Sequence, residues 1–191
     1  MLDCSLRSLI EVVGPNSFNK AEGRSNSSTI MSTCIFPGRF QPFHVGHLMV
    51  VKGMVKSCPN VTIVICSGDR ADDDLFTTEQ VREMITAALL DAEIMDATIA
   101  EVEDCSDDAE WADKVLEAAG FPEDAQVWSG DEAIRTLFEA VDVKTQKISP
   151  VPGFSGKEIR QMISSDDKEW RSKIPAGALD IVYDKTREGK Q

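Results

Sequence analysis

The feature that most limits the fold of this chain is one short run, residues 60–66 (NVTIVIC), which is β-branched and almost entirely apolar. A strand that alternates apolar and polar residues can face water on one side. A strand without that alternation must be covered on both faces, as in a parallel sheet. We therefore expect this run to be an interior strand with helices packed on both sides.

Strand-like and helix-like segments alternate along the rest of the chain. Strands are predicted at residues 32–36, 60–66, 97–102, 126–128 and 144–148, and helices at residues 46–56, 77–90, 110–119, 131–140 and 155–164. Thr77 with Gln80, and Ser155 with Glu158, have the spacing of capping boxes. This alternation predicts an α/β fold: one domain with a Rossmann-like, doubly wound parallel sheet of about five strands.

The composition limits the kinds of partner. The chain has 191 residues, 42% of them hydrophobic, and a net charge of −13. Binding a nucleic-acid backbone needs clustered Lys and Arg, so we expect no nucleic-acid partner. A nucleotide substrate remains possible, because a local site can be basic on an acidic surface. No apolar run is long enough to span a membrane, so we expect no membrane partner.

The cysteines predict the compartment in which the protein works, and the composition of the first 30 residues predicts where the folded domain begins. Five cysteines without a CxxC pair favour free thiols in a reducing cytoplasm, with Cys34 and Cys66 as small apolar residues in strands. Residues 14–29 are rich in Ser, Asn and Gly, and no signal-peptide pattern precedes them. We predict a poorly ordered extension over residues 1–30 and the folded domain over residues 31–191.

The only two histidines, His44 and His47, lie in the string GRFQPFHVGH between the first predicted strand and helix. Unpaired N–H groups and the positive end of a helix dipole attract anions at such a position. Arg39 adds a forked donor for phosphate oxygens, and Gly46 allows close approach of the backbone. The alternative to phosphate binding is that His44 and His47 have only a structural role. A zinc site lacks a third ligand, so no metal site is predicted.

Other polar segments also follow predicted strands. Ser67-Gly68-Asp69, Ser129-Gly130-Asp131 and the stretch before Ser155 each come after a strand end. Doubly wound sheets bind ligands beyond the carboxyl ends of their strands, where the strand order reverses. We therefore expect these segments and the histidine turn to converge on one crevice.

Four segments together resemble a known superfamily. They are GRFQPFHVGH (38–47), DLFTTEQVR (74–82), VWSGD (127–131) and FSGKEIR (154–160). Their order and spacing, over about residues 32–183, resemble the nucleotidyltransferases with the HxGH signature. The amino-acid sequence of the first segment is most similar to that of the corresponding segment in archaeal-type nicotinamide-mononucleotide adenylyltransferases.

The resemblance implies an adenylyltransferase that moves AMP from ATP to nicotinamide mononucleotide, giving NAD and pyrophosphate. It implies Mg²⁺ held mainly by the ATP phosphates, a cytoplasmic enzyme and a possible homo-oligomer. The attacking phosphate oxygen is already anionic, so catalysis needs positioning and charge stabilisation rather than a strong base. Two alternatives stay open: a nucleotidyltransferase acting on another phosphorylated small molecule, and a non-catalytic nucleotide-binding sensor.

The resemblance also assigns residues. It implies catalytic roles for His44, His47, Arg39 and Arg160. Binding roles for ATP and the acceptor are implied for Gly38, Phe40, Gln41, Gly46, Ser129, Gly130, Asp131, Ser155, Gly156, Lys157 and Trp111. Plain structural roles are the alternatives for three of these sites: Ser155 as a helix cap, residues 129–131 as a turn, and Trp111 as part of the core.

Overall fold

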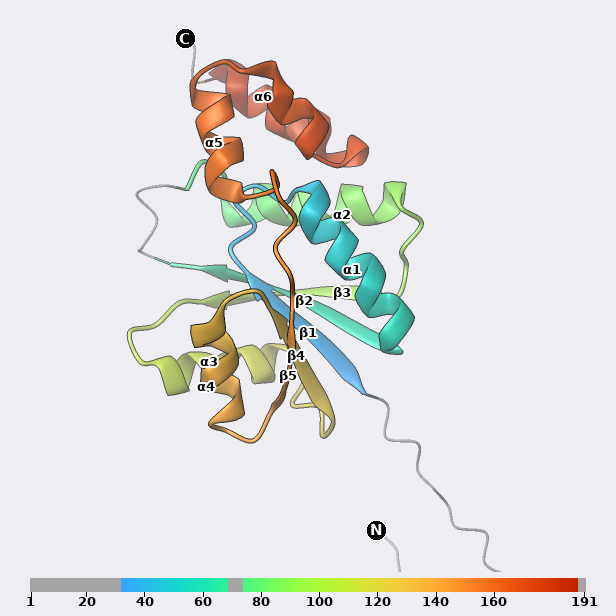
Figure 1. Ribbon diagram of the computed structural model, residues 1–191, viewed down its shortest axis with the longest axis vertical. Coiled ribbons are helices and arrows are strands. Elements are labelled where there is room, and N and C mark those ends of the chain that lie inside the picture. Colours follow the sequence, from blue (N-terminus) through green and yellow to red (C-terminus); the bar gives the residue numbers. More distant parts are fainter. Residues whose placement is uncertain (1–31, 69–73, 189–191) are drawn as a thin grey trace, which may run out of the picture.

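The computed structural model describes residues 32–68 and 74–188 (Figure 1). Its centre is a parallel sheet of five strands in the order β3-β2-β1-β4-β5. The strands are β1 (Thr33–Gly38), β2 (Asn60–Ser67), β3 (Ala97–Glu103), β4 (Ala125–Ser129) and β5 (Lys144–Lys147). The predicted fold class is confirmed. The predictions for residues 1–30 and for Asp69 lie outside the described residues.

Helices cover both faces of the sheet. They are α1 (Val45–Ser57), α2 (Thr78–Asp91), α3 (Asp108–Ala118), α4 (Glu132–Glu139), α5 (Gly156–Ser164) and α6 (Leu179–Glu188), with the 3-10 turns η1 (Lys168–Lys173) and η2 (Ala176–Ala178) before α6. Figure 1 shows α1 and α2 on one side of the sheet and α3 and α4 on the other. The five predicted helices form within two residues of their expected ends. The turns and helix after residue 165 are not predicted by the sequence pattern.

The interior strand β2 contributes to two hydrophobic cores. Ile63 and Ile65 join the core under α1 and α2, whereas Val64 and Cys66 join the core under α3 and α4. Successive side chains of a strand point to opposite faces, so one continuous apolar run serves both layers. Burying a side chain the size of isoleucine stabilises the fold by roughly 1.5–3 kcal/mol.

The segment after α5 packs back on the α1–α2 layer. Trp170, Ile174 and Val182 are buried and belong to the same core as α1 and α2. A side chain at Gly177 would collide with the carbonyl oxygen of Ala87, so the backbone of η2 lies directly against α2. Figure 1 accordingly shows α5 and α6 beyond α1 and α2, on the same side of the sheet.

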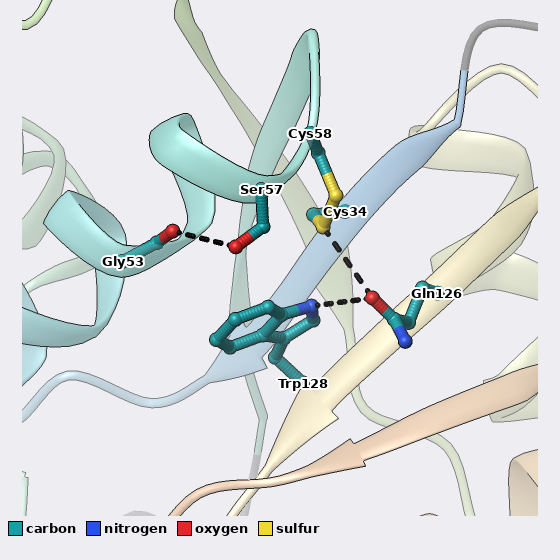
Figure 2. The surroundings of a disulfide bond; sticks show 6 residues. All are labelled: Cys34, Gly53, Ser57, Cys58, Gln126 and Trp128. Carbon is teal, nitrogen blue, oxygen red and sulfur yellow. Dashed lines mark hydrogen bonds between the residues drawn. A yellow bond between two sulfur atoms is a disulfide. The ribbon is translucent and has the colours of Figure 1, made fainter.

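Cys34 and Cys58 form a disulfide, and their Cα atoms lie 5.9 Å apart (Figure 2). The prediction of free thiols was wrong for this pair. Cys34 lies on β1 and Cys58 caps the C-terminus of α1; the helix runs back along the strand and returns the chain to its start. Cys66 and Cys105 are free thiols. In the part of the chain that the structure describes, no helix is long and apolar enough to cross a membrane.

Candidate active site

A cavity of about 390 Å³ lies where the strand order reverses, beyond the carboxyl ends of β1 and β4. The chain continues from β1 into α1 on one face and from β4 into α4 on the other, which opens a crevice between them. The predicted site residues in its lining are Gly38, Phe40, His44, Gly46, His47, Ser129, Gly130, Asp131, Ser155 and Gly156. The turns after β1 and β4 and the start of α5 thus converge as expected.

His44 and His47 cap the N-terminus of α1 for one another. Nδ1 of His44 accepts a hydrogen bond from the backbone N–H of His47 at 3.2 Å, and Nδ1 of His47 accepts one from the N–H of His44 at 3.3 Å. The two rings stack with centroids 3.5 Å apart. In a neutral imidazole one nitrogen accepts and the other donates, so each ring carries its proton on Nε2. Both histidines are therefore hydrogen-bond donors through Nε2.

Burial keeps this pair uncharged. His44 is 5% exposed, and burial lowers its pKa from 6.5 to about 4. Burial also lowers the pKa of His47 well below 6.5, and the charge that His44 would carry adds to this effect. A protonated ring would also place an N–H against the backbone N–H that it now accepts from. At neutral pH the pair offers directed hydrogen bonds rather than positive charge.

Aromatic rings and two glycines hold the histidine pair in place. The ring of Phe40 meets that of His47 edge-on, with centroids 5.0 Å apart, and the backbone of Phe40 adopts a left-handed conformation at φ 51°. A Cβ on Gly38 would lie 3.0 Å from the Phe40 ring, and one on Gly46 would lie 3.0 Å from Nδ1 of His44. Gly46 therefore makes room for the stacked imidazole, in addition to the close backbone approach expected from the sequence.

Gln41 and Arg39 tie the histidine turn to the segment that leads into α2. The buried amide of Gln41 donates to the carbonyl oxygen of Phe76 at 2.8 Å and accepts from its N–H at 3.1 Å. Arg39 pairs with Asp74 at 2.7 Å. Gln41 was expected to bind substrate, but its side-chain amide is engaged with Phe76 and lies outside the lining of the cavity. Its visible role is to position the turn.

Arg160 holds the N-terminus of α5 against the same turn. Its Nη1 donates to the carbonyl oxygen of Gln41 at 2.7 Å. A Cβ on Gly156 would lie 2.9 Å from that oxygen, so glycine permits the close contact. Ser155 accepts from the N–H of Glu158 at 3.2 Å, which is the first half of the predicted capping box. Arg160 and the exposed Lys157 flank the cavity without lining it, and their phosphate-binding roles stay predictions.

Most polar groups in the turn after β4 form hydrogen bonds within the turn or with the start of α4. Ser129 is buried, and its Oγ accepts from the N–H of Asp131 at 3.1 Å. Asp131 caps α4 by accepting from the N–H of Ala133 at 2.8 Å. Arg135 donates to the carbonyl oxygen of Ser129 at 3.0 Å. The structural alternative for this turn is therefore realised, although its residues also line the cavity.

A second cavity of about 570 Å³ adjoins the first, and Gly38 and Asp131 line both. Trp111 lines it and donates from Nε1 to a carboxylate oxygen of Asp104 at 3.1 Å. Its ring also contacts Phe138 of the core, with centroids 5.9 Å apart. Trp111 thus combines the expected cavity position with the structural alternative. Asp104 is missing from the sequence prediction, although it follows the predicted strand 97–102 and the strand-end rule could have found it.

Within residues 32–68 and 74–188, no group of three or more His, Cys, Asp or Glu side chains could hold a metal ion. Phosphate oxygens and water are the preferred ligands of Mg²⁺, which seldom occupies an all-protein cage.

Comparisons with known proteins place this geometry in a family. Residues 35–165 match the family model described as cytidylyltransferase-like. The nicotinamide-nucleotide adenylyltransferase of Methanolobus tindarius is 31% identical over 157 residues, covering 80% of this chain and 88% of that protein. The enzyme of the same name from Methanococcus aeolicus is 31% identical over 149 residues, covering 76% and 84%.

Solved structures agree on the fold. The bifunctional NMN adenylyltransferase/ADP ribose pyrophosphatase from Francisella tularensis, complexed with AMP and a Mn ion, gives a TM-score of 0.65 at 19% identity. The match covers 84% of this chain but 53% of that protein, so this chain spans about half of the bifunctional enzyme. The predicted superfamily is confirmed: this chain belongs to the cytidylyltransferase-like family of HxGH nucleotidyltransferases, together with the nicotinamide-nucleotide adenylyltransferases.

Proposed function

We propose that this protein transfers AMP from Mg-ATP to nicotinamide mononucleotide, forming NAD and releasing pyrophosphate. The observation that carries the proposal is the His44–His47 pair, whose Nδ1 atoms are both occupied by backbone N–H groups. Each ring can then act only through its Nε2–H, as a fixed donor to phosphate oxygens. Homology to enzymes with this printed activity supports the choice of reaction.

The reaction needs little from the protein beyond these donors. A phosphate oxygen of the acceptor attacks the α-phosphorus of ATP, a P–O bond forms, and the bond to the β-phosphate oxygen breaks. Pyrophosphate leaves with the electron pair, and no proton need be removed from the attacking group. Donors from His44 and His47 stabilise charge on the transferring and leaving phosphates, because they are already oriented before the reaction begins. The N-terminus of α1 adds its dipole.

The second cavity is our candidate site for the acceptor. Three carboxylates line it, from Asp104, Asp108 and Asp131, against one cation, that of Arg39, and Trp111 offers an aromatic face. Carboxylates repel the carboxylate group of a deamidated acceptor and can accept hydrogen bonds from a neutral carboxamide. This lining favours nicotinamide mononucleotide over its deamidated form. Asp104→Asn should narrow that preference, and the ratio of kcat/KM for the two acceptors measures it.

Pyrophosphate release from Mg-ATP tests the proposal, with nicotinamide mononucleotide, its deamidated form, phosphopantetheine and glycerol-3-phosphate as acceptors and CTP in parallel. Turnover with ATP and nicotinamide mononucleotide is the expected result. Turnover with another pair would favour the alternative of a different phosphorylated acceptor. Mg-ATP binding without turnover on any acceptor would favour the nucleotide-binding sensor.

Two further parts of the proposal concern the setting of the enzyme. We propose a cytoplasmic location, where ATP is available, and a homo-oligomer, as the resemblance implies. Light scattering on purified protein tests the second part, and a mass equal to one chain of 21.0 kDa would reject it.

A further inference from the structure

A lysine from beyond the family segment lies beside the candidate active site. The family match ends at residue 165, and Lys173 is the last residue of η1. Its Nζ lies 4.9 Å from the ring centroid of Phe154. Phe154 lines the cavity, next to Ser155 at the N-cap of α5. A part of the chain that the family model does not include therefore places an ammonium group against Phe154, a residue of the cavity wall, although Lys173 does not itself line the cavity.

The packing around Lys173 fixes its position. Trp170 and Ile174, on either side of it in sequence, are 2% and 3% exposed, so the core anchors η1. Gly153 has φ +78°, a conformation that favours glycine, and a Cβ there would lie 3.6 Å from the lysine Nζ. The ammonium group of Lys173 therefore lies between the glycine turn and the ring. Less side-chain entropy is lost when an already ordered lysine binds a ligand.

The groups around the cavity supply little positive charge to balance a nucleoside triphosphate, and Lys173 could supply some of it. A nucleoside triphosphate carries several negative charges, whereas the two histidines are held neutral by burial. Arg39 pairs with Asp74 and Arg160 donates to the Gln41 carbonyl oxygen. Among the described residues, no carboxylate forms an ion pair with Lys173. Its aromatic neighbour attracts the ammonium group without cancelling its charge.

We propose that Lys173 binds the phosphate chain of ATP at the α5 side of the cavity, an inference that rests on the proposed function. A lysine suits this role because its compact ammonium group, already ordered beside the Phe154 ring, acts as a point charge toward phosphate oxygens. The segment 166–178 then belongs to the nucleotide site as well as to the core, and its cation adds to those of Arg39, Lys157 and Arg160 in the family segment.

Lys173→Met, Lys173→Arg and Lys168→Met test this role. Methionine keeps most of the contact with Phe154 and removes the charge, whereas arginine keeps the charge. Lys168 lies in the same turn, is exposed and pairs with Asp166, so its variant is the matched control. Lys173→Met should raise the KM for Mg-ATP about tenfold, the effect of one lost charge-assisted hydrogen bond. The KM for nicotinamide mononucleotide should stay within about twofold, and Lys173→Arg should restore most of the ATP affinity.

Calorimetric binding of Mg-ATP and of inorganic pyrophosphate separates this proposal from the proposed function. If the wild type binds Mg-ATP without turnover, the proposed function fails, and the binding comparison still tests Lys173. The proposal is overturned if Lys173→Met binds both ligands like Lys168→Met, or if arginine fails to restore binding. A lower Tm with equal rises in both KM values would also overturn it, because that pattern marks a structural role.

Discussion

Two helices begin at the same cavity and are capped by different chemistry. At α1 the cap is His44, closed reciprocally by His47, and both rings are packed among aromatic side chains. At α5 the cap is the hydroxyl of Ser155, with the exposed Lys157 and half-buried Arg160 in the turns that follow. The α1 end is buried and neutral, whereas the α5 end is partly exposed and cationic.

The difference teaches how one site can combine precise geometry with charge. A rigid, neutral pair of donors can hold its angles because both rings are stacked and hydrogen-bonded, but it cannot balance several negative charges. Flexible cations can balance them, but a solvated cation holds its position less well. Under the proposed function, the α1 end acts on the reacting phosphate and the α5 end acts on the rest of the phosphate chain.

The largest effect should come from His47→Ala, which removes one fixed donor and half of the α1 cap. We expect kcat to fall by about 10²–10³, as for the loss of one preorganised donor to a transition state. The KM for Mg-ATP should change little, because the lost hydrogen bond matters most when charge develops. Steady-state kinetics measure both. If His47→Ala keeps the wild-type kcat, then His47 has no catalytic role and the α1 and α5 ends do not differ in the way proposed.

The second effect is a pH dependence that belongs to the α1 end. His44 has a pKa of about 4 in the folded protein against 6.5 as its ordinary value, so the unfolded chain binds its proton first. Stability is therefore full above pH 6.5 and falls as the pH drops towards 4, by about 3 kcal/mol for this group. Urea unfolding from pH 7 to pH 5 measures it, in a range above the ordinary pKa of the carboxylates.

The control is His44→Asn, which keeps an N-cap acceptor and cannot gain a proton. Its stability should vary about half as much over the same range, because His47, whose pKa burial also lowers, still contributes. If the free energy of unfolding of this variant falls with decreasing pH as steeply as that of the wild type, then His44 is not held neutral in the folded protein.

A smaller effect should follow from Arg160→Ala at the α5 end. This change removes the hydrogen bond to the Gln41 carbonyl oxygen and a cation beside the cavity. We expect about a tenfold rise in the KM for Mg-ATP, corresponding to one charge-assisted bond, with kcat within about threefold. Arg187→Ala in α6 is the matched control, since that side chain contacts Tyr183 instead. A larger fall in kcat than in ATP affinity would contradict the proposal that the α5 end binds the phosphate chain while the α1 end acts on the reacting phosphate.

The smallest effect should come from Ser155→Ala, which removes the hydroxyl cap of α5. An N-cap serine contributes about 1 kcal/mol, and thermal unfolding measures the loss. The KM for Mg-ATP should rise only about twofold, because the backbone N–H groups of α5 remain to bind phosphate. Ser164→Ala, at the other end of the same helix, controls for the loss of a hydroxyl. A kcat loss comparable with that of His47→Ala would make the two caps equivalent.

The sequence predicts the sheet and the first five helices because each has a local signature. Residues 60–66 are apolar throughout, and Thr77 with Gln80 forms the full capping box that its spacing indicates. The segment after residue 165 has no such signature. Its buried residues include Trp170 in η1, Ile174 at the C-cap of η1 and Val182 in α6, and these pack on the α1–α2 layer.

The same distinction applies to the site. The string GRFQPFHVGH predicts a phosphate-handling turn, but not that the imidazoles cap one another, which depends on backbone angles. Gln41 binds Phe76, a partner 35 residues away in sequence. Cys34 meets Cys58 only because α1 folds back along β1. These contacts are tertiary, so neither residue type nor spacing indicates them.

The strand order also has a consequence for folding during synthesis. The half of the sheet made of β1, β2 and β3 pairs neighbours in sequence, and it carries the histidine turn. The opposite wall of the cavity, at Ser129, Phe154 and Lys173, emerges from the ribosome 80 to more than 120 residues after the second histidine. Contacts so distant in sequence close late. We expect nascent chains to form the histidine turn well before they can retain a nucleotide.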